Sequence, residues 1–175
     1  MQPQRRVKAI SEPRDRFYFK DYKGKTAEDR MKKATEHALQ HASFYDKLVQ
    51  AGFIHPETRF AIDGDEESVF IAFSQPEVQA PKPGFKFEAI AKPKLAAELR
   101  EIKLYKLERL KEFMEIEGVR PRGDWKHDFN WGFDGNDLYY IDAHILLEKR
   151  PFKQKKLPAA LWERIAQALR TKNKK

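Results

Sequence analysis

Side chains that can move a proton or hold a hard metal ion are concentrated in one short part of the sequence. Asp124, His127, Asp128 and Asn130 lie close together, and Asp142 follows after a short interval. A carboxylate can accept the proton of an attacking hydroxyl. Mg²⁺ prefers oxygen ligands and keeps several of its waters, so an amide and a carboxylate are enough to hold it when substrate phosphates complete its coordination.

A β-hairpin is predicted between the amide and the last carboxylate. Residues 130–133 and 138–141 are two short, mainly apolar runs, and residues 134–137 between them read Asp-Gly-Asn-Asp. An Asp-Gly pair between apolar runs is a strong signal for a tight hairpin turn. Folding the hairpin back on itself is expected to bring Asn130 close to Asp142.

A long helix is predicted directly before this segment, from about Pro93 to Glu117. Its apolar residues recur at helical spacing in two neighbouring rows: Leu95, Leu99, Ile102, Tyr105, Phe113 and Ile116, then Leu104, Leu107, Leu110 and Met114. Because the apolar stripe is wide, we expect this helix to be covered on more than one side.

Four strands and another helix are predicted in the first half of the chain. In chain order they are strands at residues 6–10 and 16–22, a helix at residues 27–50, and strands at residues 60–63 and 68–73. The second strand carries Lys20 among aromatic residues, and the helix carries Glu36. Three prolines within residues 74–84 exclude regular structure there and indicate a linker. A last helix is expected over residues 158–170.

The order acid, Asn, hairpin, acid resembles the catalytic and metal-binding segment of protein kinases and of the related aminoglycoside-phosphotransferase-like kinases. The phosphotransferase form reads roughly Gly-Asp-x-His-x-x-Asn, followed by a hairpin and Ile-Asp. Gly123-Asp124, His127, Asn130 and Ile141-Asp142 match it. The preceding elements follow the same series as in this family: a strand with Lys, a helix with Glu, two strands, a hinge and a long helix.

The resemblance implies the α+β class and a minimal two-lobed protein-kinase-like fold. Residues 1–79 would form the N-lobe, a small antiparallel sheet with the helix at residues 27–50. Residues 80–92 would be a proline-rich hinge. Residues 93–171 would form a mainly helical, reduced C-lobe that contains the catalytic-loop hairpin, and residues 172–175 would be a basic tail.

The resemblance also implies a reaction and its cofactors. The protein would be a kinase that uses ATP and Mg²⁺ to phosphorylate a hydroxyl of a protein or a small molecule. Lys20 and Glu36 would pair and position the nucleotide phosphates, and Asn130 and Asp142 would hold Mg²⁺. Asp124 would accept the proton of the attacking hydroxyl.

The spacing of the catalytic loop departs from the family pattern. Asp124 lies six residues before Asn130, whereas the family usually has five. Either Trp125 or Lys126 is therefore an insertion, and Asp128 is a rival for the role of base.

Two further departures point to a reduced form of the family. Residues 11–15 stand where the Gly-rich loop over the phosphates is expected, so positive charge there would come from Arg14 or Arg16. The sequence runs only to Lys175 after Asp142, which leaves no room for the usual activation segment or for most C-lobe helices. A protein partner or substrate would then dock elsewhere.

Composition excludes several classes of protein. The chain has 175 residues, of which 41% are hydrophobic and 35% charged, as in a globular domain. It has no cysteine, which excludes disulfides, thiolate chemistry and Cys-based zinc sites. No apolar run approaches the roughly 18 residues of a membrane span, and the first residues lack a signal-peptide core. We therefore expect a cytoplasmic protein without a membrane partner.

The net charge of +8 is carried by the two ends of the chain. Residues 152–175 hold eight Lys or Arg and one Glu, and residues 1–16 hold five Lys or Arg and two acids. Basic ends are usually solvated arms, although they leave binding of nucleic acid open. Three functions remain: a reduced kinase, a catalytically inactive kinase-like adaptor, and a basic nucleic-acid-associated protein. The phosphoacceptor and the oligomeric state stay open.

Overall fold

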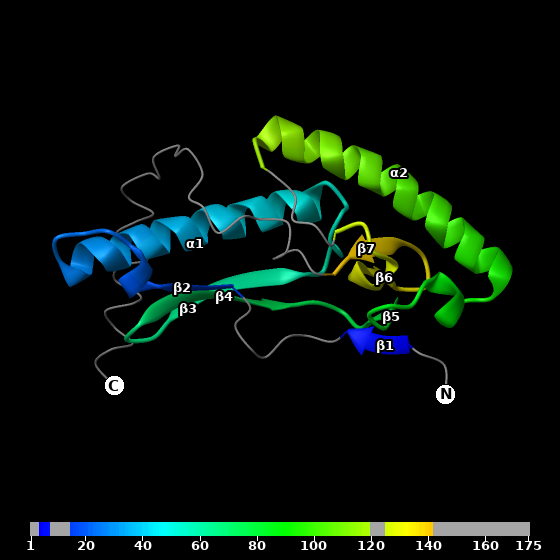
Figure 1. The fold of residues 1–175 in the computed structure, drawn as a ribbon, viewed down its shortest axis with the longest axis horizontal. Coiled ribbons are helices and arrows are strands. Elements are labelled where there is room, and N and C mark those ends of the chain that lie inside the picture. The colour runs from blue at the N-terminus through cyan, green and yellow to red at the C-terminus, as the bar shows by residue number, and fades with distance from the viewer. Residues whose placement is uncertain (1–3, 8–14, 120–124, 142–175) are drawn as a thin grey trace.

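The computed structural model of the chain describes residues 4–7, 15–119 and 125–141 (Figure 1). These residues form two long helices and two antiparallel sheets, which confirms the predicted α+β class. Asp124, Asp142 and the helix expected over residues 158–170 lie outside the described residues. The division into lobes, hinge and tail stays a prediction.

One sheet has three strands, with β4 (Ser68–Ser74) between β2 (Asp15–Tyr18) and β3 (Arg59–Gly64). The hairpin of β3 and β4 is the one that the sequence predicts. Helix α1 (Ala27–Gln50) lies along this sheet and contacts all three strands (Figure 1). The apolar residues of α1 therefore have a continuous surface to pack against.

Helix α1 has the ends that its sequence predicts. The backbone N–H of Asp29 donates to Thr26 Oγ1 at 3.0 Å, and the N–H of Thr26 donates to Asp29 Oδ2 at 3.3 Å, which completes a capping box. Gly52 follows the helix with φ of 78°, a conformation that glycine adopts without steric cost. The predicted helix over residues 27–50 is confirmed.

The second sheet has four strands in the order β1 (Gln4–Val7), β5 (Val78–Pro81), β6 (Trp131–Phe133) and β7 (Leu138–Tyr140). It joins three distant parts of the chain and lies beside α2 in the half of the molecule away from β2 (Figure 1). Buried side chains from both halves form one apolar cluster, which includes Leu48 of α1, Leu110 of α2 and Trp131 of β6.

Helix α2 (Pro93–Glu117) has the predicted bounds, with Pro93 in its first turn and Gly118 at φ of 69° after it. Its fully buried side chains are few: Ala96, Leu99, Leu110 and Met114. Leu104, Tyr105 and Ile116 are 60%, 58% and 83% exposed. The prediction that this helix is covered on more than one side is wrong in the described structure, because only one side of α2 meets other described elements.

Two predictions for the first strands need correction. Strand β1 covers Gln4–Val7 and so begins before residue 6, because its register is set by pairing with β5; residues 8–10 lie outside the described residues. Strand β2 ends at Tyr18 and Lys20 lies in the 3-10 turn η1 (Phe19–Asp21). Local hydrogen bonds end the strand: the N–H of Phe19 donates to the Glu67 carbonyl, and the N–H of Tyr22 to the Phe19 carbonyl.

The proline-rich segment at residues 74–84 contains regular structure, contrary to the prediction. Strand β5 lies within it and pairs with β1 on one side and β6 on the other. Of the three prolines only Pro81 belongs to the strand, and it is the last residue there, where a missing N–H disturbs the ladder least. The expected hinge at residues 80–92 therefore begins inside a sheet.

Gly132 of β6 allows the hairpin to lie against β5. A Cβ atom on Gly132 would collide with Val78 and would lie 2.9 Å from Ile141 Cγ2. We expect Gly132→Ala to destabilise the fold by about 1–3 kcal/mol through overpacking, as measured by urea unfolding. Adding Val78→Ala should restore part of the loss. Equal stability of Gly132→Ala and wild type would contradict this close approach.

Candidate functional site

The hairpin of β6 and β7 brings the chain back beside Asn130, the candidate amide ligand. The N–H of Ile141 donates to the Asn130 carbonyl at 2.9 Å, so the chain returns beside Asn130 one residue before Asp142. The turn is closed by Asp134, whose Oδ1 accepts the N–H groups of Asn136 and Asp137 at 2.7 and 2.9 Å. The predicted hairpin is confirmed over the described residues.

Asn130 is held inside the protein. It is fully buried and ends the 3-10 turn η3 (Asp128–Asn130), where its N–H donates to the His127 carbonyl at 3.1 Å. The exposed His127 ring stacks on Phe129, with ring centres 5.2 Å apart. The backbone of Asn130 therefore has a fixed place beside the end of the hairpin.

Asp128, the rival candidate for the base, is a structural tether in the described fold. Its carboxylate forms an ion pair with Lys103 of α2, and its Oδ2 accepts the backbone N–H of Phe87 at 3.2 Å. Lys103 also donates to the Lys126 carbonyl at 3.1 Å. Asp128 is 9% exposed, and both of its oxygens bind groups of the protein itself. This favours Asp124 as the base in the kinase interpretation.

Lys20 and Glu36 lie in the other half of the molecule from the hairpin. The Lys20 ammonium is exposed and lies 5.4 Å from the centre of the Tyr18 ring. Glu36 is half-buried on α1. Within the described residues, no ion pair joins Lys20 to Glu36. The structure thus does not bring these two side chains together as the resemblance implies.

The separation of Lys20 from Asn130 follows from the strand register. Lys20 comes directly after β2, whose last residue, Tyr18, lies opposite Ser68 at the start of β4. The chain leaves the other end of β4, at Ser74, to reach β5. A strand of seven residues spans roughly 20 Å. Lys20 is therefore at the end of the sheet that lies away from β5 and the hairpin.

Arg16 also has a structural partner. Its guanidinium forms an ion pair with Asp65 in the β3–β4 turn and donates to Ser68 Oγ at 2.6 Å. Burial opposes ionisation of Asp65, but hydrogen bonds from Arg16 and from the backbone outweigh it and lower the pKa of Asp65 from 3.8 to about 2. Arg16 is thus committed to this turn. Arg14, the other cation considered for the phosphates, lies outside the described residues.

Sequence reasoning missed Arg5, which lies beside the candidate site. Arg5 pairs with Ala80 in the register of β1 and β5, and its Nη2 donates to the carbonyl of Phe129. Phe129 directly precedes Asn130. No local signal could have found this contact, because it depends on the pairing of the first strand with β5.

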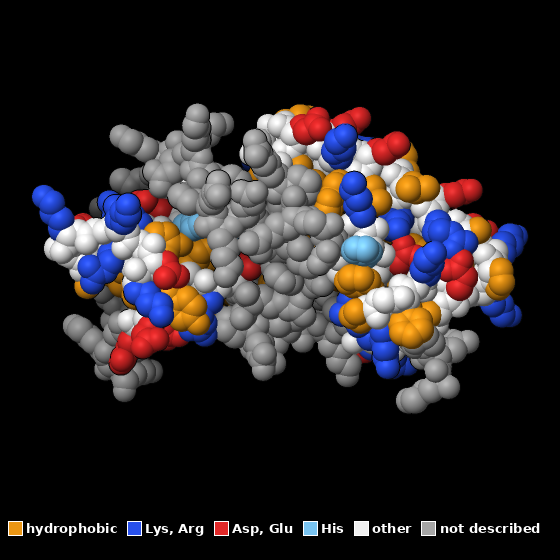
Figure 2. Space-filling view, viewed as in Figure 1, with side chains coloured by type: hydrophobic (Ala, Val, Ile, Leu, Met, Phe, Trp, Pro, Cys, Tyr) orange, Lys and Arg blue, Asp and Glu red, His pale blue; other side chains and the backbone are white. Residues whose placement is uncertain are grey.

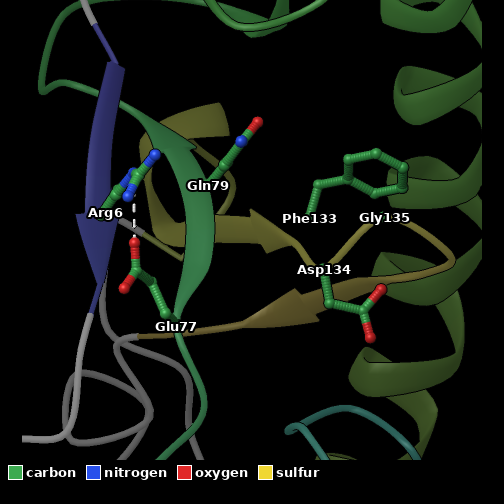
Figure 3. Close-up of a pocket in the computed structure, with 6 residues that line it drawn as sticks. All are labelled: Arg6, Glu77, Gln79, Phe133, Asp134 and Gly135. Atoms are coloured by element: carbon green, nitrogen blue, oxygen red, sulfur yellow. Dashed lines mark ion pairs between the residues drawn. The ribbon is translucent and has the colours of Figure 1, made fainter.

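A pocket of about 340 Å³ lies beside the hairpin turn and is formed by β1, β5 and the hairpin (Figure 3). Arg6 and Glu77 form an ion pair at 3.1 Å along one side of it. Gln79, Phe133 and Asp134 also line it (Figure 3). Because Phe133 and Gly132 are successive strand residues, this pocket opens on the sheet face opposite to Gly132.

A buried histidine pair, His37 and His41, lies on α1 beneath β2. The two side chains are 4% and 3% exposed, and their Nε2 atoms are 3.1 Å apart. The Tyr22 hydroxyl lies 2.7 Å from His37 Nδ1, and Phe17 contacts both rings edge-on. Burial, followed by the proximity of His37, lowers the pKa of His41 from 6.5 to about 3.

Comparison with known proteins gives no assignment: the chain matches no protein-family model, no curated protein and no solved structure. Among the described residues, no three His, Asp or Glu side chains are grouped so that they could hold a metal ion. The same residues include no helix that is long and apolar enough to cross a membrane.

Proposed function

We propose that the protein is a phosphotransferase that uses ATP and Mg²⁺, a reduced relative of the kinases that its sequence resembles. The observation that carries the proposal is the return of the hairpin to Asn130 through the Ile141–Asn130 hydrogen bond. In this proposal the next residue in the sequence, Asp142, would supply a carboxylate near the buried amide of Asn130. An amide together with a carboxylate would suit Mg²⁺ that is also bound to nucleotide phosphates.

The order of elements supports the same proposal. The described chain runs through a strand, helix α1, the hairpin of β3 and β4, a connection, helix α2 and the hairpin of β6 and β7. Apart from strand β5 in the connection and Lys20, which lies just after the first strand of the series, this is the order that the resemblance implies. Helix α1 packs on the sheet formed by the strands around it. In this proposal Asp124 accepts the proton of the attacking hydroxyl, and catalysis is mainly positioning and charge neutralisation.

A second candidate, a catalytically inactive kinase-like adaptor, is favoured by one observation. Lys20 lies near the start of β4, whereas the chain leaves the other end of β4 to reach β5 and the hairpin. The length of β4 therefore separates Lys20 from phosphates bound near Asn130, and Lys20 does not reach them. A protein without this lysine contact would hold nucleotide weakly or not at all. It would act by binding another protein.

The nucleic-acid alternative has less support from the described residues. On the face that Figure 2 shows, Lys and Arg side chains alternate with acidic ones over α2. They do not form a continuous basic surface there, as binding to a phosphate backbone requires. The basic residues 152–175 lie outside the described residues.

Thermal unfolding with ATP and Mg²⁺ tests the proposed function. A ligand at a hundredfold excess over its Kd stabilises the native state by about 2.7 kcal/mol, a shift of several degrees for a chain of this size. We expect this shift in wild type and its loss in Asp142→Asn, which removes a charge with little change in shape.

The exposed Asp46→Asn on α1 is the matched control, since it removes the same charge from a solvent-exposed residue that is not a candidate ligand. It should retain the full shift. No shift in wild type would reject the phosphotransferase and favour the adaptor. An equal shift in Asp142→Asn and wild type would reject the metal site.

A further inference from the structure

A second pocket, of about 550 Å³, lies at the end of the molecule that holds η1 and the first turn of α1. Its volume is in the range of sites for small molecules. Basic, acidic and aromatic side chains line it together: Tyr18, Phe19, Lys20, Arg30, Glu66 and Glu67. Figure 2 shows basic, acidic and hydrophobic side chains beside one another at the end of the molecule where α1 begins.

The basic and the acidic side chains of this pocket come from different elements. Lys20 lies in η1 and Arg30 in the first turn of α1, whereas Glu66 and Glu67 lie in the turn between β3 and β4. The N–H of Phe19 donates to the Glu67 carbonyl at 2.9 Å, which joins η1 to this turn. The pocket therefore receives positive charge from η1 and α1 and negative charge from the β3–β4 turn.

These four charged groups are available to a ligand. Within the described residues, no ion pair joins any of them to an opposite charge, whereas Asp65 of the same turn is already paired. The Lys20 ammonium lies 5.4 Å from the centre of the Tyr18 ring. Arg30 donates to the Gly24 carbonyl at 3.4 Å, and a Cβ on Gly24 would lie 3.1 Å from Arg30 Cγ. Close packing against Gly24 thus holds the stem of Arg30 at the pocket.

We propose that this pocket binds a small zwitterion, which carries a carboxylate at one end, an ammonium group at the other and an apolar body between them. Lys20 and Arg30 bind the carboxylate, for which the planar guanidinium fork is well suited. The two glutamates accept the hydrogen bonds of the ammonium group. The Tyr18 ring, which is 37% exposed, offers an apolar surface for the body of the ligand.

A polyanion such as ATP fits this pocket poorly, because the carboxylates of Glu66 and Glu67 repel phosphate groups. The site is therefore separate from the proposed phosphotransferase function and does not depend on it. A simple amine or a simple carboxylate would satisfy only half of its charges. Both opposite charges of the ligand should contribute to binding.

Binding of para-aminomethylbenzoate to the full chain, followed by NMR titration, tests this inference. The probe carries a carboxylate and an ammonium group at opposite ends of an aromatic ring. Benzoate and benzylamine each lack one of the two groups. We expect both to bind at least about tenfold more weakly than para-aminomethylbenzoate, because each loses one set of charge-assisted hydrogen bonds.

Substitutions in the pocket should act on one end of the probe at a time. In Lys20→Met the advantage of para-aminomethylbenzoate over benzylamine should largely disappear. In the double variant Glu66→Gln and Glu67→Gln its advantage over benzoate should largely disappear. These three residues are exposed, so the variants should fold as wild type does. The matched control is Lys25→Met, which removes an exposed charge outside the pocket and should bind all three probes as wild type does.

Three results would overturn the zwitterion site. Wild type might not bind para-aminomethylbenzoate, or might bind the three probes equally well. Equal weakening by Lys20→Met and Lys25→Met would mean that only the overall charge matters. None of these measurements uses ATP or Mg²⁺, so failure of this inference is distinguishable from failure of the proposed function.

Discussion

Replacing Lys103 by Met is expected to destabilise the fold by about 3–5 kcal/mol, because it leaves the buried Asp128 carboxylate without its cation. The side chains of Lys103 and Asp128 are 12% and 9% exposed, so water does not replace the lost partner. The pair also joins α2 to the turns at Phe87 and Asp128. Urea unfolding of the variant and of wild type measures the loss directly.

Two further variants separate the ion pair from other effects of the substitution. Lys111→Met removes an exposed charge from the same helix and should change stability little. Adding Asp128→Asn to Lys103→Met removes the unpaired charge but keeps an acceptor for the Phe87 N–H, so it should recover much of the loss. If Lys103→Met were no more destabilising than Lys111→Met, the tether assigned to Asp128 would be incorrect.

Acid is expected to destabilise the protein between about pH 6.5 and pH 4 through His41. The folded-state pKa of His41 is lowered from 6.5 to about 3, so in this range the unfolded chain binds a proton that the folded chain excludes. The stabilising contribution is complete above pH 6.5 and falls by roughly 1.4 kcal/mol per pH unit below it. Stability measured by urea unfolding at several pH values should show this slope.

Another imidazole, His37, lies beside His41, so the test needs a variant that removes His41 alone. The described groups packed around it are His37, the Tyr22 hydroxyl, and Tyr45, whose hydroxyl donates to the Asp15 carboxylate. Burial raises the pKa of both tyrosines, which keeps them neutral. Asp65 has a pKa lowered to about 2, so its contribution to the stability of the fold is lost only below about pH 3.8.

His41→Phe should flatten the slope between pH 6.5 and pH 4, since Phe fills a similar volume and does not titrate. It should lower stability at neutral pH somewhat, because it leaves His37 without its neighbour's ring nitrogen. His127→Gln replaces an exposed histidine and serves as the control, with the wild-type slope retained. A wild-type slope in His41→Phe would show that other groups cause the acid sensitivity.

Local sequence signals predicted the helices and hairpins whose ends or turns are fixed by hydrogen bonds between nearby residues. The capping box at Thr26 and glycines after both long helices set the bounds of α1 and α2. Short turns with Asp side chains set the two hairpins, because Asp65 and Asp134 bind the backbone of their own turns. In each case the deciding hydrogen bonds join residues a few positions apart, so the pattern is visible in the sequence.

Contacts between distant segments could not be predicted in this way. The pairing of β1 with β5 decides both the extent of the first strand and the position of Arg5. The early end of β2 depends on the Glu67 carbonyl, and it places Lys20 outside the strand. The position of Asp128 in the sequence makes it a candidate base, but its ion pair with Lys103 of α2 is formed only in the folded chain. These contacts depend on tertiary packing, which overrides local preference.

The most direct test of the central claim is the Mg²⁺ dependence of ATP binding, measured by titration calorimetry of the full chain with Mg²⁺ and with excess EDTA. If Asn130 and Asp142 hold the metal on the nucleotide phosphates, wild type should bind ATP at least about tenfold more tightly with Mg²⁺, and Asp142→Asn should lose this difference. ATP affinity that is unchanged by Mg²⁺, or no ATP binding at all, would contradict the phosphotransferase.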